Sequence, residues 1–279
     1  MRIPIYQVDA FATAPSRGSL FSGNPAAVCP LERWLKDETL QAIAAENNLA
    51  ETAFYYVDEK GRYRLRWFTP ELEIDLCGHA TLASAYVILE LRRESQSSQI
   101  TFDSRSGELS VAREGELYVL DFPARPPIES AEDAATFNAV SEALGARPSE
   151  FLRARDCVCV FNNEAQIRAL APDFAGLART DCFAVIATAP GEDCDFVSRF
   201  FAPRAGIPED PVTGSAHSTL IPFWSQRLGK KKMFARQLSR RGGELWCEDR
   251  GARVGIGGRA VGYLEGHIIV PSEVPSESV

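Results

Sequence analysis

Two similar segments, one in each half of the chain, limit most strongly what this sequence can fold into. In the first half Phe-Thr-Pro at 68–70 is followed by Gly-His-Ala-Thr-Leu at 78–82, and in the second half Phe-Ala-Pro at 201–203 is followed by Gly-Ser-Ala-His-Ser-Thr-Leu at 214–220. Three additional residues separate the two parts in the second copy. A period this long exceeds that of any solenoid repeat, so the pattern predicts a globular protein made from two copies of one half.

Each copy has the features of a helix start. Asp75 or Asp210 comes shortly before the glycine, and an apolar run follows it. If the copies face each other, two helix N-termini with unpaired N–H groups converge on one cleft, where a small carboxylate or enolate is stabilised. Because long strands surround one helix in each half, we expect an α+β fold of two similar lobes, each a mostly antiparallel sheet or barrel wrapped around a central helix.

The proline-rich segment 123–127 marks the boundary between the lobes, since it cannot continue a strand ladder. We therefore expect an N-terminal lobe of residues 1–125 and a C-terminal lobe of residues 126–265, and we consider that residues 266–279 complete the first lobe. Alternating or apolar runs predict strands over 3–11, 26–29, 53–57, 62–68, 99–102, 108–113, 117–122, 158–161, 183–187 and 195–201, and helical spacing predicts helices over 37–46, 81–91 and 215–228.

Proline and glycine set the end of the second half. Pro222 is expected to kink or shorten the last helix, and Gly229 to end it. The glycines between 242 and 262 are expected to divide a final set of strands that ends near Val270, followed by a tail over 271–279.

Composition excludes several classes of protein. A chain of 279 residues with 45% hydrophobic residues exceeds the size at which a single core usually divides. The net charge is −8 and the basic residues are dispersed apart from 230–232 and 240–241, so we expect no nucleic acid partner. No apolar run approaches the eighteen or so residues of a membrane span and no leader precedes the first strand, which predicts no membrane partner and a cytoplasmic protein.

Seven cysteines are present, an odd number, and most lie in apolar segments. We expect reduced, buried thiols, including Cys29, Cys157, Cys159 and Cys182.

Candidate chemical groups surround the first helix start. Glu51 stands at the entrance to an apolar strand, where a partly desolvated carboxylate suits a general base, although taken alone it is more simply a solvated strand-end acid. Asp75 is a candidate cap, Gly78 permits close approach of the backbone, and His79 lies in the first turn, where the helix dipole favours its neutral form. A cap with a satisfied histidine explains this segment equally well. Cys77 is a candidate acid/base thiolate because a helix N-terminus lowers the pKa of a thiol.

The second helix start offers an anion-binding nest. Pro211 fixes Asp210, and Thr213, Gly214 and Ser215 open the helix. The alternative interpretation is an elaborate helix cap. The resemblance of this segment to the first helix start argues against that interpretation. His217 is expected to pack inward.

The sequence lacks the residues that several other kinds of site require. Three histidines without close spacing and no Cys-x-x-Cys pair predict no metal site. The glycines at 255–258 lie among strands, which does not match a dinucleotide fingerprint, and the chain has no phosphate-loop lysine motif or nucleophile elbow. We therefore expect a reaction without a metal or cofactor.

Taken together, these segments resemble the PhzF-like family of phenazine-biosynthesis isomerases, which shares the duplicated fold of diaminopimelate epimerase. The resemblance covers nearly the whole chain, through residues 8–11, 23–28, 51–54, 66–70, 75–83, 210–217 and 242–245. It implies that Glu51 is the catalytic acid/base and that His79, Asp210 and Ser215 hold the substrate. It also implies that Asn24 and the Gly214–Ser215 turn bind the substrate carboxylate and that the protein is a homodimer.

Epimerase and racemase relatives present a cysteine at each helix start. Here Cys77 matches the cysteine of the first helix start, whereas Thr213 stands at the second helix start. The hydroxyl of Thr213 is too weak an acid to replace a thiolate. We therefore expect an isomerase in which Glu51 moves a proton between carbons of a small, unsaturated carboxylate metabolite, with Cys77, Gly78 and Thr213 in supporting positions. The alternatives are an amino-acid epimerase or racemase that uses Cys77, and a non-catalytic protein that binds a metabolite or another protein.

Overall fold

The computed structural model describes residues 1–14, 20–129 and 134–271, and the predicted tail after residue 271 lies outside these ranges. The first half contains β1 (Arg2–Ala12), β2 (Asn24–Pro30), α1 (Asp37–Asn47), β3 (Glu51–Val57), β4 (Tyr63–Phe68), β5 (Glu73–Ile74), α2 (Gly78–Tyr86), a π-helical continuation η2 (Val87–Leu91), β6 (Gln99–Ser104), β7 (Gly107–Glu114) and β8 (Leu117–Pro123).

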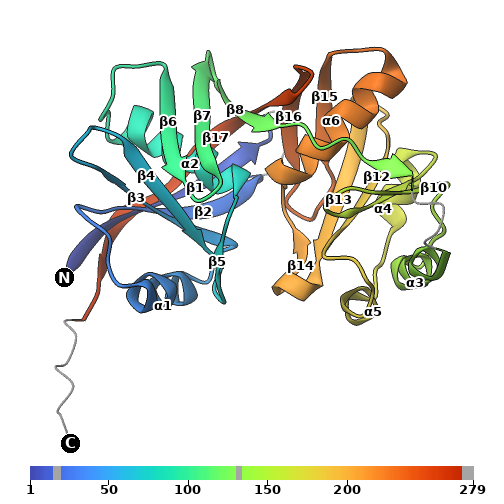
Figure 1. Cartoon of the computed structure of the whole chain (residues 1–279), viewed down its shortest axis with the longest axis horizontal. Helices are drawn as coiled ribbons and strands as arrows, with labels where there is room; N and C mark the ends of the chain where they lie inside the picture. Colours follow the sequence, from blue (N-terminus) through green and yellow to red (C-terminus); the bar gives the residue numbers. More distant parts are fainter. Residues whose placement is uncertain (15–19, 130–133, 272–279) are drawn as a thin grey trace, which may run out of the picture.

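The second half contains β9 (Ile128–Glu129), α3 (Ala134–Leu144), β10 (Glu150–Arg153), β11 (Cys157–Val160), α4 (Glu164–Ala169), α5 (Phe174–Ala178), β12 (Val185–Pro190), β13 (Phe196–Ala202), a short 3₁₀ turn η3 (Pro203–Ala205), β14 (Ile207–Asp210), α6 (Gly214–Leu228), β15 (Lys232–Gln237), β16 (Gly243–Asp249) and β17 (Arg253–Ile269). Figure 1 shows the two halves as adjacent lobes, with β8 and β17 crossing between them.

Strand pairing follows the same order in both halves. β1 pairs antiparallel with β2, β2 parallel with β3, β3 antiparallel with β4, and β4 parallel with β6. In the second half β10, β11, β12, β13 and β15 repeat these four pairings with the same directions. The predicted duplication and the two-lobed α+β fold are confirmed.

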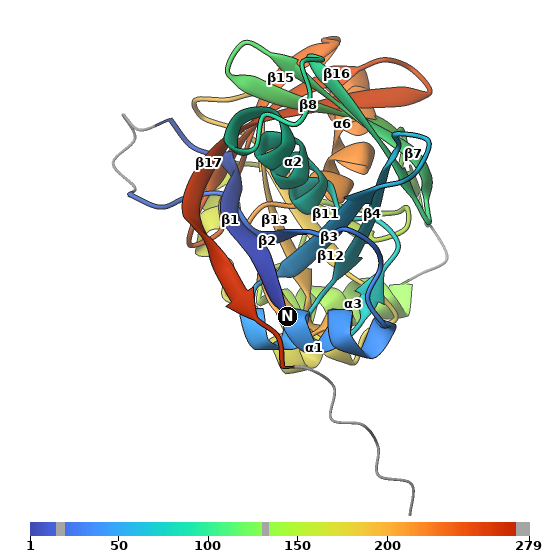
Figure 2. The same cartoon turned by 90° about the vertical axis from the view of Figure 1, so that its left-hand side faces the viewer.

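The central helices are enclosed by their sheets. Every residue of α2 from Gly78 to Ala85 is buried, and six of the eight are Gly, Ala, Ser or Thr. A helix that is buried on all sides needs no apolar stripe, and small side chains let the surrounding strands approach it closely. Figure 2 shows α2 within the strands of the first lobe and α6 behind it.

Pro222 leaves α6 continuous from Gly214 to Leu228. Because proline has no N–H group, the carbonyl of Ser218 has no partner within the helix at this position. The backbone N–H of Arg125 donates to the Ser218 carbonyl at 2.8 Å. The inter-lobe segment therefore supplies the hydrogen bond that Pro222 removes, and the prediction that this proline shortens the helix is wrong.

The last strand joins the two halves. The final glycines do not divide it, since β17 is a single strand of 17 residues. Residues 253–258 pair with β8 on one side, and residues 259–269 pair with β1. The division at residue 125 and the return of 266–279 to the first lobe stay predictions.

One pair of cysteines departs from the expectation of reduced thiols. Cys157 and Cys182 form a disulfide with their Cα atoms 5.8 Å apart. The parallel pairing of β11 with β12 brings these segments together, which spacing along the chain does not reveal. Cys29 and Cys159 are free and buried as predicted. None of the helices in the described ranges is long and apolar enough to cross a membrane.

Candidate active site

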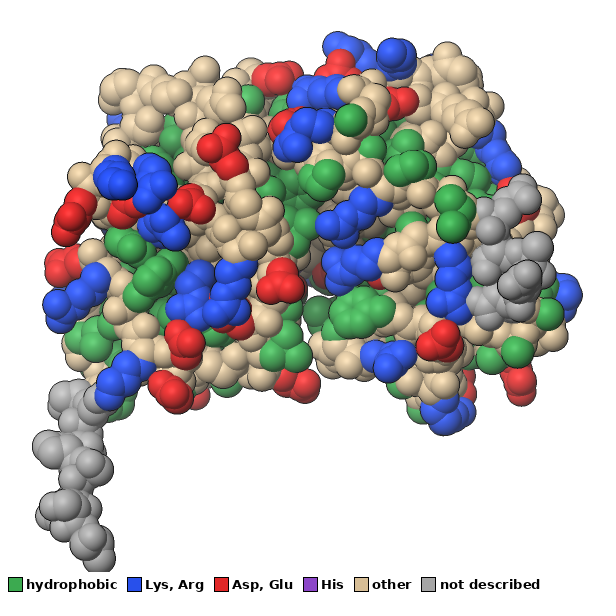
Figure 3. Space-filling view, viewed as in Figure 1, with side chains coloured by type: hydrophobic (Ala, Val, Ile, Leu, Met, Phe, Trp, Pro, Cys, Tyr) green, Lys and Arg blue, Asp and Glu red, His purple; other side chains and the backbone are tan. Residues whose placement is uncertain are grey.

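A cavity of about 520 Å³ lies between the two lobes. Most of the predicted site residues line it, from both halves: Glu51, Cys77, Gly78, His79, Asp210, Thr213, Gly214 and Ser215. Figure 3 shows a hollow between the lobes, with positively charged side chains of the second lobe on one side and an acidic side chain on the other.

The two helix starts meet at their glycines. A Cβ atom on Gly78 would lie 3.2 Å from Cα of Gly214, and one on Gly214 would lie 3.3 Å from Cα of Gly78. Cys77 and Thr213 are the N-cap residues, and neither side chain caps its helix. The prediction that Asp75 caps α2 is therefore wrong. N–H groups of both first turns thus lie beside the cavity without a side-chain cap, an arrangement that favours an anion.

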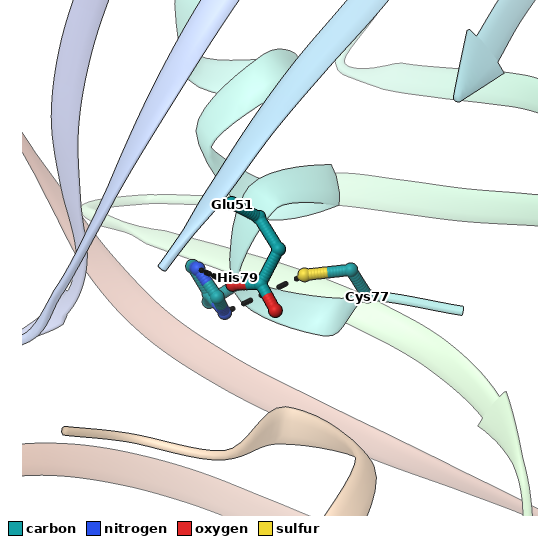
Figure 4. A group of neighbouring side chains, drawn as sticks. All are labelled: Glu51, Cys77 and His79. Atoms are coloured by element: carbon teal, nitrogen blue, oxygen red, sulfur yellow. Dashed lines mark hydrogen bonds and ion pairs between the residues drawn. The ribbon is translucent and has the colours of Figure 1, made fainter. Parts of the chain in front are cut away.

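Glu51, His79 and Cys77 form a buried cluster at the start of α2 (Figure 4). Glu51 is the first residue of β3, as predicted, and its Oε2 lies 3.0 Å from Nε2 of His79. Nδ1 of His79 lies 3.5 Å from Sγ of Cys77. The carboxylate and the thiol thus contact opposite nitrogens of one imidazole ring.

The charge state of this cluster differs from the sequence-based expectation. Burial acts to lower the pKa of His79, but the neighbouring Cys77 and Glu51 outweigh it and raise the pKa well above the usual value. Burial and the charge of Glu51 raise the pKa of the Cys77 thiol. Cys77 is therefore a neutral thiol at neutral pH, and the Glu51 carboxylate 3.0 Å away favours the protonated form of His79. The helix dipole favours the opposite states. At Cys77 burial and the Glu51 carboxylate override it, and at His79 the neighbouring groups override both the dipole and burial.

Asp210 is held by hydrogen bonds at the start of α6. Nδ2 of Asn24 donates to Oδ1 of Asp210 at 2.7 Å, and the Thr213 hydroxyl donates to Oδ2 at 2.5 Å. Gln237, which belongs to no motif in the sequence, donates to the Asp210 carbonyl and accepts from the N–H of Thr213. Burial raises the pKa of Asp210 to about 6, against the lowering effect of the charge on His79.

Asn24 lies behind the cavity surface. It is fully buried and is absent from the residues that line the cavity. Its amide nitrogen also lies 3.2 Å from Nδ1 of His79, so it contacts groups of both helix starts. In this structure Asn24 is placed to position Asp210, while its predicted contact with a substrate carboxylate stays untested. His217 packs inward as predicted, where burial lowers its pKa to about 4.

The cluster at α2 also contains metal-binding residue types. Ligand atoms of Glu51, Cys77 and His79 all lie within 4.8 Å of one another. This grouping is not visible in the sequence, because Glu51 lies far from Cys77 and His79 along the chain and the chain has neither closely spaced histidines nor a Cys-x-x-Cys pair. Carboxylate, imidazole and thiolate together suit zinc, so the expected absence of a metal stays a prediction.

Matching ion pairs define how the two copies correspond. Arg66 forms two hydrogen bonds with Glu73, and Arg199 forms two with Glu209. Each arginine comes two residues before the repeated phenylalanine, and each glutamate comes five residues before the repeated glycine. The counterpart of Asp210 is therefore Ile74, and the pairing of Asp75 with Asp210 is wrong. The three additional residues lie between the proline and the glutamate of the second copy.

The cavity residues that the sequence did not single out include Arg125, at the boundary between the halves, and Arg155 and Phe183 in the second half. They belong to no repeated motif, and Arg125 lies in the segment predicted only as a linker.

Comparisons with known proteins agree with this architecture. Residues 8–266 match a family model described as phenazine biosynthesis-like protein. An uncharacterized isomerase of Pseudomonas aeruginosa is 53% identical over 95% of this chain and 98% of its own length. The crystal structure of a phenazine biosynthesis protein of the PhzF family from Enterococcus faecalis has 44% identity and a TM-score of 0.88, covering 97% of this chain and 100% of its own. A hydroxyproline epimerase from Agrobacterium vitis, 10% identical with a TM-score of 0.57 over 96% of this chain and 92% of its own, shares the fold.

Proposed function

The chain belongs to the phenazine biosynthesis-like (PhzC–PhzF) family and is an isomerase, and we propose that it moves a proton between two carbon atoms of a small, unsaturated carboxylate. The observation that carries this proposal is the buried pair of Glu51 and His79 at the start of α2, where the starts of α2 and α6 converge. A carboxylate there can accept a proton, and the adjacent N–H groups can stabilise negative charge on a substrate.

The proposed step is redox-neutral. Glu51 takes a proton from one carbon, and the electrons of that C–H bond form a new double bond. The electrons of the old double bond take the proton back from Glu51 at the second carbon. Charge that develops on the substrate carboxylate faces the N–H groups of α2 and α6 and the protonated ring of His79. Because one carboxyl group acts as both base and acid, we propose that the reaction uses no metal or other cofactor.

The environment of Cys77 supports this scheme over epimerisation by two thiols. A neutral, buried thiol is a weak base, and Thr213 stands at the corresponding position of the second half. The Thr213 hydroxyl also donates a hydrogen bond to the Asp210 carboxylate. Neither helix start therefore offers a ready thiolate.

We further propose a homodimer in the cytoplasm. Support for the homodimer comes from exposed apolar side chains on one face of β17 and beside it: Phe21, Val261, Tyr263 and Leu264. Phe21 packs edge-on against Tyr263 with ring centroids 5.4 Å apart. The cytoplasmic placement rests on the sequence alone, and the Cys157–Cys182 disulfide is a kind of bond that is uncommon in that compartment.

Deuterium incorporation from heavy water tests the proposed reaction. A panel of cyclic and acyclic unsaturated carboxylates, with and without an amino group, is incubated with the enzyme and followed by NMR. A substrate should exchange a carbon-bound proton and give an isomer, and Glu51→Gln should abolish both. Asp75→Asn is the matched control, because Asp75 is an exposed acid that lines the same cavity. Exchange that persists in Glu51→Gln contradicts the proposal.

A further inference from the structure

The strand starts of the second half do not repeat the acid/base group of the first. Phe68 pairs with Thr52 in the first half, and Phe201 pairs with Val185 in the second. The position of Glu51 is thus occupied by Ala184 in the second half. Ala184 is buried, and its neighbour Phe183 lines the cavity with 45% of its surface exposed.

Arg155 lies next to Phe183 on the cavity wall. Its guanidinium carbon is 4.9 Å from the centroid of the Phe183 ring. The disulfide between Cys157 and Cys182 joins the two segments that carry these residues. The arginine and the aromatic ring are therefore held together by two independent contacts, although they lie far apart in the sequence.

Arg125 adds a second guanidinium to this wall. It lines the cavity, and none of the described residues forms an ion pair with its side chain. Its backbone N–H is fixed by the carbonyl of Ser218 in α6. The side chain is thus anchored at its base, and its charged end is available to a ligand.

The buried carboxylate of Asp156 interacts electrostatically with both arginines. Asp156 is 5% exposed, and its Oδ1 lies 3.8 Å from Nε of Arg155. Burial raises the pKa of Asp156, against the lowering effect of Arg155 and Arg125. Two guanidinium groups with one counter-charge leave this wall with an excess of positive charge.

Acidic residues on the opposite wall do not neutralise that excess. Glu73 is bound by Arg66 and by Arg105, with closest contacts of 2.7 Å to each. Asp75 lines the cavity as an exposed side chain, and no ion pair joins it to either Arg125 or Arg155. An anion that enters the cavity therefore has two arginines on one wall as candidate partners.

We propose that Arg125 and Arg155 bind a second carboxylate of the substrate and that Phe183 packs against its unsaturated part. This inference rests on the proposed function, since the first carboxylate is the one held at the helix starts. It identifies the substrate class as a small, planar or partly unsaturated dicarboxylate. Guanidinium groups bind carboxylates with paired hydrogen bonds, and an aromatic face suits a planar partner.

The experiment compares two probes that differ by one carboxylate. Binding of benzoate and of isophthalate is measured by calorimetry with the wild-type enzyme and with Arg125→Gln, Arg155→Gln and the double variant. Isophthalate should bind about tenfold more tightly than benzoate to the wild type, and the double variant should bind both alike. The control is Arg147→Gln, because Arg147 also packs over a phenylalanine of the second half, 4.5 Å from the Phe137 ring centroid, but lies away from the cavity.

The outcomes separate this inference from the proposed reaction. Equal affinity of the wild type for the two probes, or no isophthalate binding at millimolar concentrations, overturns the second-carboxylate subsite. A preference for isophthalate that survives in the double variant overturns the assignment to Arg125 and Arg155. Glu51→Gln should keep the preference while losing proton exchange. A Glu51→Gln variant that keeps both supports the subsite and contradicts only the proposed reaction.

Discussion

The starts of α2 and α6 have the same backbone arrangement and different side-chain chemistry. Both helices begin with a glycine after an extended N-cap residue, and the two glycines are in contact. Around α2 lie a carboxylate, a protonated imidazole and a thiol, which are groups that move or hold protons. Around α6, hydroxyl and amide groups hold Asp210 in a fixed network. The duplication thus retained a backbone suited to anions, while the side chains of the two copies took on separate tasks.

The strand starts show the same divergence. Glu51 begins β3 beside the proton-bearing cluster, whereas the equivalent region before β12 presents Phe183, which packs against Arg155. A substrate between the lobes would therefore meet acid/base chemistry on one side and recognition groups on the other. Five substitutions, in four experiments, test this division of tasks.

The largest effect is expected at the ion pair beside α2. His79→Gln removes the cation 3.0 Å from Glu51 and keeps a polar side chain. A buried carboxylate without a cation is favoured in its protonated form, so kcat for the proposed reaction should fall by about two to three powers of ten. The activity of the variant should recover toward higher pH, which a damaged fold would not produce. An unchanged kcat and pH profile would show that α2 does not carry the acid/base chemistry.

The next effect concerns stability at the α6 start. Burial raises the pKa of Asp210 from 3.8 to about 6, so the folded protein holds this proton more tightly than the unfolded chain does. The free energy of unfolding should therefore fall as pH rises from about 4 to about 6, by about 3 kcal/mol from this group. Asp210→Asn should remove that part of the fall in urea titrations across this range. Asp75→Asn, at an exposed acid, should retain it, and identical curves for the wild type and Asp210→Asn would contradict the assignment.

A smaller loss of stability is expected where the two starts touch. Gly78→Ala and Gly214→Ala place a methyl group 3.2 or 3.3 Å from the backbone of the other helix. Overpacking of this kind costs about 1–3 kcal/mol, and the two variants should lose similar amounts because they probe one contact. Gly266→Ala is the control, since its Cβ would meet only a leucine side chain at 3.9 Å. Thermal unfolding that is unchanged in both cavity variants would argue against direct contact.

The sequence predicted the duplicated frame because its signals are local. A phenylalanine, a proline and a glycine recur with apolar helices after them, and the meeting of two helix starts follows from that symmetry. The protonation states of Cys77 and His79 were predicted with the wrong direction because that prediction also used local signals alone. The helix dipole can be inferred from the segment 77–86 alone. Burial by the surrounding strands raises the pKa of Cys77, and Glu51, which comes from β3, adds to that rise and to the rise that Cys77 causes at His79.

Other features depend on contacts between distant segments. The Cys157–Cys182 disulfide requires the parallel pairing of β11 with β12, and Gln237 reaches Asp210 from β15. One missed signal was readable in the sequence. Arg66 with Glu73 and Arg199 with Glu209 recur at matching positions in the two copies, and they would have shown that Asp210 corresponds to Ile74.

The smallest effect is expected for Cys77, and it discriminates between the two modes of proton transfer. Burial raises the pKa of this thiol, and its counterpart in the second copy is Thr213, so neither helix start supplies a thiolate base. Cys77→Ser keeps a small polar group 3.5 Å from Nδ1 of His79 and should lower kcat by less than about tenfold. Alkylation of the wild-type thiol at neutral pH should be slow for the same reason. Complete loss of activity in a folded Cys77→Ser variant, with rapid alkylation that a substrate blocks, would instead make Cys77 a base and favour epimerisation.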